Sequence, residues 1–166
     1  MLQGRGEFVR LVLEDIGAQY VDVARQAGSL EEGAGLVMKA RTEGLGVGIR
    51  AFAPPFLRVG STVLSQTSVI CDFLARRHGL IADDEATQAV GRGVMLTILD
   101  VVDAAHDTHH PIAASLTYEE QFEAATIAGE LFAKQRLPTV LSYFEALLTD
   151  SGTWLLGGPN PSYVDI

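Results

Sequence analysis

The chain has 166 residues, enough for one domain of average size or two small ones, and its 48% hydrophobic content predicts a sizeable buried core. Its formal net charge of -9 argues against binding to nucleic acid, which requires clustered Lys and Arg. No apolar stretch approaches the length of a membrane span, no signal peptide opens the chain, and the single Cys71 excludes an intramolecular disulfide. We therefore expect a soluble, cytoplasmic protein that does not bind membranes.

The first stretch predicts a glycine-rich turn and then a helix. The turn Gly4-Arg5-Gly6-Glu7 can approach a ligand closely, because two of its four residues lack a side chain. Gly17 is a natural stop for the helix. The apolar positions at helical spacing are Phe8, Leu11, Val12 and Ile16.

The next segments give weaker signals. Residues 19–23 alternate polar and apolar side chains, which predicts a strand. Residues 29–41 favour a helix that Gly33 and Gly35 weaken. The glycines of residues 43–48 are loosely spaced and follow no clear strand, so a flexible loop is favoured over a phosphate-binding fingerprint.

Residues 53–70 carry the densest set of signals. A proline pair precedes two short apolar strands, residues 56–59 and 62–64, and Gly60-Ser61 between them has the composition of a type II′ hairpin turn. Residues 66–68 then begin a helix, and we expect its free N–H groups and positive dipole end to form an anion site. The apolar face expected for this helix consists of Val69, Ile70, Phe73 and Leu74.

This segment resembles the glutathione-binding half of the cytosolic glutathione transferases. In that family the proline before the hairpin is cis, and a Gln-Ser/Thr pair at the helix start holds the γ-glutamyl carboxylate and amine of glutathione. The resemblance thus implies that Pro55 is the cis proline and that Gln66 and Thr67 bind glutathione. An ordinary hairpin followed by an ordinary capped helix is the alternative for this segment.

The resemblance also assigns a role to the first turn. In the tyrosine-type classes, the arginine that matches Arg5 lies beside the glutathione thiol and favours its thiolate. A solvated turn arginine is the alternative. Side chains near residues 39–50 hold the glycine end of glutathione in the family, which makes Lys39, Arg41 and Arg50 candidates without a choice among them.

Two departures from the family pattern affect the chemistry. The family's first strand carries the catalytic Tyr, Ser or Cys, and it would precede Met1, so the catalytic residue stays unknown. An incomplete chain is favoured over a protein that lacks this residue, because a sheet without that strand would expose a long edge beside the site. In addition, Pro54 stands before the cis proline, where family members form two backbone hydrogen bonds with glutathione. Pro54 can accept through its carbonyl but has no N–H to donate.

Beyond an acidic linker, residues 81–86, the pattern becomes all-helical. An apolar stripe starting at Val94 predicts one helix, which Pro111 bends or ends. Thr117 and Glu120 form a capping box for a second helical stretch, in which Pro138 should introduce a kink. The first stripe comprises Val94, Ile98, Val101 and Ala105, and the second stretch carries Phe122, Leu131, Leu137, Leu141, Phe144 and Leu148.

Polar residues of the first of these helices allow several roles. Asp100, Asp103, Asp107 and His110 share one face, and a solvated face is the simplest interpretation. In the family, an acidic residue of this helix reaches the γ-glutamyl amine of the other subunit, which makes Asp100 and Asp103 candidates for a cross-dimer or acceptor-pocket role. His106 and His109 add metal-ligand chemistry, but no spacing matches a recognised signature, and we expect no metal.

The remaining signals are the single cysteine, Cys71, and a polar pair at the end of the chain. Cys71 lies in an apolar run with no basic partner, which favours a buried, inert thiol over a nucleophile. Ser162 and Asp165 have the spacing of a capping box. In the family this box begins a further buried helix, and Ile166 ends the chain before that helix. The capping box therefore also favours an incomplete chain.

Together these features resemble a bacterial, tyrosine-type-like glutathione transferase cut at both ends. They imply an incomplete transferase fold, with an α/β thioredoxin-like domain over residues 1–80 and an all-α domain over residues 87–166. The implied activity is conjugation of the glutathione thiolate to a hydrophobic electrophile by a homodimer, with Gln66, Thr67, Pro54, Pro55 and Arg5 at the site. A non-catalytic module of the same fold, and a metal-assisted activity at the Asp/His helix, are the alternatives.

Overall fold

The computed structural model describes residues 4–48 and 50–166, so the expectations for the residues before Gly4 lie outside it. The chain divides after Asp84 into two compact units, and we call them the first unit and the second unit. The second unit comprises Glu85–Asp165. Each is described by itself. A search of the described helices finds none whose length and hydropathy would suit a membrane span.

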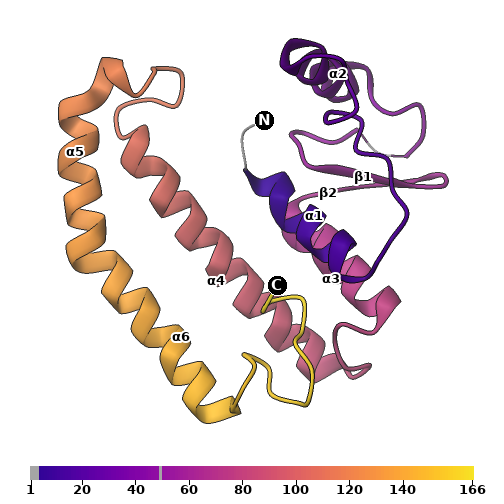
Figure 1. Ribbon diagram of the computed structural model, residues 1–166, viewed down its shortest axis with the longest axis vertical. Helices are drawn as coiled ribbons and strands as arrows, with labels where there is room; N and C mark the ends of the chain where they lie inside the picture. Colours follow the sequence, from indigo (N-terminus) through magenta and orange to yellow (C-terminus); the bar gives the residue numbers. More distant parts are fainter. Residues whose placement is uncertain (1–3, 49) are drawn as a thin grey trace. The chain divides into compact units, whose positions relative to one another are not determined.

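The first unit combines three helices with one small sheet (Figure 1). The strands pair antiparallel with Val59 opposite Thr62, which leaves Gly60-Ser61 as the predicted two-residue turn. Gly60 has φ +60, the positive value that the first central position of a type II′ turn requires. The elements are α1 (Arg5–Asp15), α2 (Leu30–Glu43), β1 (Phe56–Val59), β2 (Thr62–Ser65) and α3 (Thr67–His78).

The core of the first unit includes facing stripes of α1 and α3, which pack against each other. On both helices the stripe differs from the predicted one. Leu11 and Val69 are 43% and 49% exposed, because the buried stripes are turned by about one residue from the expected faces. The buried residues are Val9, Val12 and Leu13 of α1 and Ile70, Cys71, Leu74 and Ala75 of α3.

The strand predicted over residues 19–23 is absent, and this expectation was wrong. The alternating polar side chains bind α1 instead. The Tyr20 hydroxyl donates to Glu14 at 2.7 Å, and Asp22 accepts from the Arg10 guanidinium at 2.6 Å. Among the described residues the sheet contains β1 and β2 alone, so no neighbouring strand is present to share backbone hydrogen bonds with this segment.

Helix α2 forms despite its two glycines. Ser29 caps it by accepting from the Glu32 N–H at 3.1 Å. Gly33 is needed for packing, since a Cβ there would lie 2.5 Å from the Ala24 carbonyl oxygen. Gly35 has open space around it. The loop predicted after this helix is confirmed over residues 44–48.

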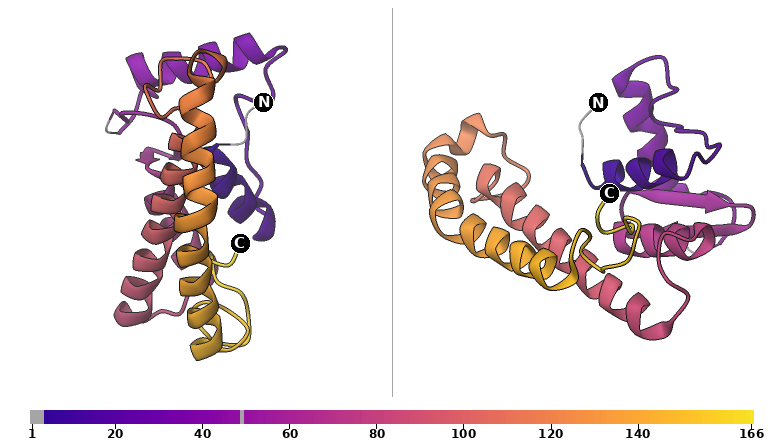
Figure 2. Two further views of the ribbon diagram at one scale, coloured as in Figure 1. Left: turned by 90° about the vertical axis from the view of Figure 1, so that its left-hand side faces the viewer. Right: turned by 60° about the horizontal axis from the view of Figure 1, so that its bottom comes forward.

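The second unit is all-helical, with α4 lying beside the run of α5 and α6 (Figure 2). Its first helix begins inside the predicted linker, at Glu85. The buried positions of α4 are Gly91, Val94, Met95 and Leu99, whereas Ile98, Val101 and Ala105 of the predicted stripe are only half-buried. The elements are α4 (Glu85–His109), η1 (Glu119–Gln121), α5 (Phe122–Leu131), η2 (Phe132–Arg136) and α6 (Leu137–Ser151).

One buried glutamine organises the corner between α4 and α5. Helix α4 ends at His109, just before Pro111, and the capping box of Thr117 and Glu120 forms as predicted, with bonds of 2.7 and 3.3 Å. Gln121 is 3% exposed. Its amide oxygen accepts from the N–H groups of residues 112 and 113, and its nitrogen lies 3.1–3.2 Å from three carbonyl oxygens of the same corner.

The second helical stretch is interrupted where Pro138 predicts it. The interruption is the π-helical turn η2, immediately before α6. Proline has no N–H to donate to the carbonyl four residues earlier. The five-residue hydrogen-bond spacing of a π-helical turn accommodates that loss. The predicted apolar face is only partly buried here: Phe122, Leu131 and Leu141 are more than half exposed, and Ala125 and Val140 are buried instead.

The last residues form a tight polar turn around Asp165. Its carboxylate accepts from the Leu155 N–H at 2.8 Å, from the Ser162 N–H at 2.9 Å and from the Ser162 hydroxyl at 2.7 Å. Asp165 therefore reaches back as the capping box predicts. Ser162 does not accept through its hydroxyl as expected, because that hydroxyl donates to Asp165 and the Asp165 N–H binds the Ser162 carbonyl.

Candidate functional site

The start of α3 has an unusual backbone. Gln66 joins β2 to α3 with φ +69 and ψ 123, and it is the one residue other than glycine with positive φ among those that the structure describes. Such a conformation costs about 1–3 kcal/mol and is concentrated at functional sites. The Gln66 side chain is exposed, so its amide is open to a ligand.

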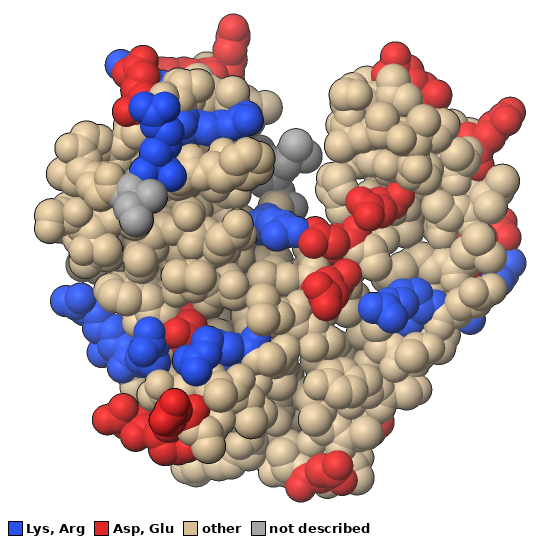
Figure 3. All heavy atoms as spheres, turned by 180° about the vertical axis from the view of Figure 1, so that it is seen from behind, with Lys and Arg blue, Asp and Glu red and all other residues tan. Residues whose placement is uncertain are grey.

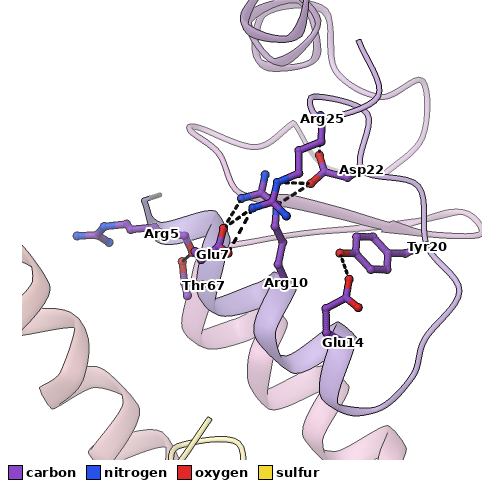
Figure 4. Close-up of polar contacts among 8 residues, drawn as sticks. All are labelled: Arg5, Glu7, Arg10, Glu14, Tyr20, Asp22, Arg25 and Thr67. Carbon is purple, nitrogen blue, oxygen red and sulfur yellow. Dashed lines mark hydrogen bonds and ion pairs between the residues drawn. The ribbon is translucent and has the colours of Figure 1, made fainter. Parts of the chain in front are cut away.

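Thr67 connects the start of α3 to the start of α1 (Figure 4). Its side chain is 1% exposed, and its hydroxyl donates to the Arg5 carbonyl oxygen at 3.1 Å. Two helix N-termini therefore lie together, each with the partial positive charge of its dipole and of its first N–H groups. This pair of helix ends favours an anion more strongly than either end alone.

The proline pair borders the same place. The Pro54–Pro55 peptide bond is cis, as predicted. A Cβ built on Gly6 would lie 3.9 Å from the Cβ of Pro55, so the first turn of α1 lies close to this proline. The structure thus brings together Arg5, Pro55 and Thr67, with Gln66 beside them, from three segments that are far apart in the sequence.

Arg5 adds a positive charge to this region. It lies in the first turn of α1 instead of in the turn predicted before the helix. Figure 4 shows its guanidinium extending away from the neighbouring Glu7, Arg10 and Asp22. A cation at a helix N-terminus is electrostatically unfavourable, and it adds to the positive potential that an anionic ligand would meet.

An ion-pair network that the sequence did not reveal holds α1 to the following loop (Figure 4). Arg10 bridges Asp22 at 2.6 Å and Glu7 at 3.0 Å, and Arg25 contacts Glu7 at 2.9 Å. The hydrogen bond with Asp22 raises the pKa of Arg10. Burial acts to raise the pKa of Asp22, but the hydrogen bonds from Arg10 and the Arg25 N–H, with both positive charges, lower it overall. The Glu7–Arg10 spacing of three residues was the available sequence signal.

The other predicted first-unit residues have different surroundings. Lys39 lies 3.9 Å from Glu43, one turn further along α2, and the Arg41 guanidinium lies 5.9 Å from the centre of the Phe52 ring. Arg50 is exposed. Cys71 is 1% exposed, and burial raises the pKa of its thiol to about 12, which confirms a buried thiol in place of a nucleophile.

In the second unit, Asp100 and Asp103 are exposed on α4, and their role remains a prediction. The rings of His106 and His110 stack with their centres 4.9 Å apart, and His110 Nδ1 lies 3.1 Å from the Leu116 carbonyl oxygen. Within residues 4–48 and 50–166, no three His, Cys, Asp or Glu side chains gather as they would around a metal ion.

Comparison with known proteins identifies the fold. Residues 106–166 match the family model "Glutathione S-transferase, C-terminal domain". No curated protein sequence matches the chain. Among solved structures, a Caenorhabditis elegans glutathione transferase superposes with a TM-score of 0.64 at 20% identity, covering 97% of this chain and 70% of its own.

Two further solved structures agree. The transferase Na-GST-3 of Necator americanus, described as monomeric, has a TM-score of 0.64 at 18% identity and covers 97% of this chain and 70% of its own. The Ascaris lumbricoides transferase has a TM-score of 0.62 at 20% identity, with coverage of 98% and 71%. The chain has the glutathione transferase fold, in which a thioredoxin-like α/β part precedes an all-α part.

Proposed function

We propose that this chain is a glutathione transferase, which binds glutathione at the start of α3 and conjugates its thiolate to a hydrophobic electrophile. One observation carries the proposal. The Thr67–Arg5 hydrogen bond of 3.1 Å places the N-termini of α1 and α3 side by side, next to the exposed amide of Gln66. This is a site for the carboxylate of a small anionic ligand.

This proposal gives direct roles to Gln66, Pro54 and Arg5. The Gln66 amide and the N–H groups at the start of α3 bind the γ-glutamyl end, and the Pro54 carbonyl accepts from the cysteine N–H of glutathione. Arg5 favours the ionised thiol through its positive charge. Because Pro54 cannot donate in return, binding is weaker by about 0.5–1.5 kcal/mol than with a residue that has an N–H.

The chemistry requires positioning and charge stabilisation. The thiol releases its proton, the sulfur then forms a bond to an electrophilic carbon, and a leaving group departs from that carbon with its electron pair. Binding both reactants in one site is the largest contribution to the rate, and stabilisation of the thiolate adds to it. The side chain that accepts the proton is not assigned.

The oligomeric state of the protein is also a proposal. The solved structures of the same fold are glutathione transferases, which supports this activity. A homodimer in which Asp100 or Asp103 of one subunit approaches the ligand of the other would be consistent with the exposure of both carboxylates on α4. The monomeric Na-GST-3 makes the oligomeric state a separate question.

Calorimetric titration with glutathione tests the binding step. Gln66→Ala keeps the backbone cost of positive φ nearly unchanged, because both residues have a Cβ, and removes only the side-chain amide. We expect this variant to raise the dissociation constant at least tenfold. The matched control is Gln26→Ala, an exposed glutamine of the same unit, which should stay within twofold of the wild type.

The outcomes separate the candidate functions. No measurable binding to the wild-type chain, or equal binding to Gln66→Ala, would contradict the proposal. Binding without conjugation of an activated chloronitrobenzene would instead support the alternative of a non-catalytic binding module. Both binding and conjugation, each lost in Gln66→Ala and kept in Gln26→Ala, would support the transferase.

A further inference from the structure

The neighbours of the Gln121 amide fix its orientation. Its oxygen accepts from the N–H groups of Ile112 and Ala113 at 3.0 and 3.4 Å. Its nitrogen lies 3.1–3.2 Å from the carbonyl oxygens of Ala113, Leu116 and Thr117. The reverse orientation would turn the amide oxygen towards three carbonyl oxygens, none of which can donate. The amide nitrogen therefore supplies two N–H protons to this corner.

The same carbonyl groups determine which nitrogen of His110 carries the proton. Its Nδ1 lies 3.1 Å from the Leu116 carbonyl oxygen and 3.2 Å from the Gln121 amide nitrogen. A proton on Nδ1 is donated to Leu116, and the two amide protons then serve the other two carbonyl oxygens, so three protons match three acceptors. Without that proton, the Nδ1 lone pair would face a carbonyl oxygen that also only accepts. These contacts assign the proton to Nδ1, and Nε2 of the neutral ring then carries the lone pair.

His106 lies one helical turn before His110 and is arranged in a similar way. The two rings stack with their centres 4.9 Å apart, and the His106 side chain is 57% exposed. Its Nδ1 lies 3.4 Å from a carboxylate oxygen of Asp107, which accepts and does not donate. Histidines that bind metal ions usually donate one ring N–H to a carbonyl or carboxylate oxygen and bind the ion through the other nitrogen. Both rings have this arrangement.

We propose that His106 and His110 form a two-histidine site for a divalent transition-metal ion such as Zn²⁺, which binds to Nε2 of each ring. The neutral imidazole nitrogen is a favoured ligand of such ions. Two nitrogens bound to one zinc ion lie about 3.4 Å apart, and the exposed His106 side chain can turn to reach this separation. Because no three His, Cys, Asp or Glu side chains gather within residues 4–48 and 50–166, water completes the coordination. The inference is independent of the proposed function, in which neither histidine has a part.

Calorimetric titration of the full chain with zinc chloride, in buffer freed of other metals, tests the site. His106→Gln removes one ligand from an exposed position of α4. We expect it to weaken zinc binding at least tenfold. The matched control is His109→Gln, since this exposed histidine lies beside the pair with its Nδ1 3.2 Å from the Thr108 hydroxyl. It should stay within twofold of the wild type. No zinc binding to the wild type, or equal binding to His106→Gln, would overturn the inference.

The second ligand needs a variant that preserves the corner between α4 and α5. His110→Asn keeps an N–H donor on a short side chain, which can replace Nδ1 opposite the Leu116 carbonyl, and it removes Nε2. We expect an at least tenfold loss of zinc affinity with little change in the urea midpoint of unfolding. Unchanged zinc affinity in this variant would overturn the inference.

NMR of the imidazole nitrogens tests the site without any variant, and it decides if His110→Asn does not fold. In the metal-free wild type we expect the His110 proton on Nδ1. Zinc should then shift the Nε2 resonances of His106 and His110 and leave those of His78 and His109 unchanged. A proton on Nε2 of the neutral His110 ring, or zinc-induced shifts confined to His78 or His109, would overturn the inference.

Discussion

In the first unit, polar side chains join segments that are far apart in the chain, whereas in the second unit they mostly organise their own neighbourhood. Thr67 and Arg5 are 62 residues apart, and Arg25 and Glu7 are 18 apart. Gln121 and Asp165 bind groups 3 to 11 residues away. Long-range polar contacts gather chemical groups into a site, while local ones satisfy the backbone of loops and helix ends.

Charge separates the two units as well. Three of the 12 basic residues, Arg92, Lys134 and Arg136, lie beyond Asp84, against 11 of the 21 acidic residues. The second unit therefore carries most of the net charge of -9. On the face shown in Figure 3, most of the basic atoms lie over the first unit. The positive groups are thus concentrated in the unit that holds the candidate anion site.

The largest expected effect is the protection of the buried Cys71 thiol from alkylation in the folded first unit. The thiolate is the reactive form, and burial raises the pKa of this thiol to about 12. Alkylation by iodoacetamide at pH 8 should therefore be slower in the folded protein than in urea by roughly a thousandfold or more. Fast labelling of the folded protein, timed by mass spectrometry, would show that the core between α1 and α3 opens readily.

The next effect tests the local organisation of the second unit. Gln121→Ala leaves the N–H groups of Ile112 and Ala113 without their acceptor in a partly buried corner. We expect it to lower the free energy of unfolding by about 2–3 kcal/mol in urea titrations. Gln135→Ala, at an exposed glutamine of the same unit, should change it by less than about 0.5 kcal/mol. Equal effects would contradict the central role of Gln121.

A pair of glycines in α2 gives opposite expectations. Gly33→Ala should destabilise the first unit by about 1–3 kcal/mol, since the new Cβ would lie 2.5 Å from the Ala24 carbonyl oxygen. Gly35→Ala has open space and should stabilise the helix by up to about 1 kcal/mol. Thermal melts of the two variants should therefore shift in opposite directions. A shift in the same direction would contradict the close approach of α2 to Ala24.

The smallest effect is a pH dependence of the ion-pair network. The pKa of Asp22 is lowered in the folded state, so its stabilisation is present above the unfolded pKa of about 3.9 and is lost as pH falls through the lower folded value. Asp22→Asn should remove less than about 1 kcal/mol at pH 7 and nearly nothing at pH 2. Unfolding titrations at both pH values measure this difference.

Local signals in the sequence predicted local structure well. The turn at Gly60, the capping box of Thr117 and Glu120, the end of α4 before Pro111 and the interruption at Pro138 all depend on residues within one or two turns of each other. The start of α3 was predicted correctly for the same reason. Such features need no knowledge of the packing partner.

The errors came from contacts between distant segments. Alternation predicted a strand at residues 19–23, but Asp22 pairs with Arg10 on α1 instead. Helical spacing placed Leu11 and Val69 on buried faces, and a shift of one residue in how α1 and α3 meet exposes both. The site was assembled from a family resemblance, and the commitment of the Thr67 hydroxyl to Arg5 required coordinates.

The positive φ of Gln66 places two competing selective pressures on this position. A library screened only for heat resistance should enrich glycine there, because glycine adopts positive φ at little cost. A library screened for retention on immobilised glutathione should keep glutamine. Sequencing both pools would compare the residue that glutathione binding selects at this position with the residue that folding alone selects.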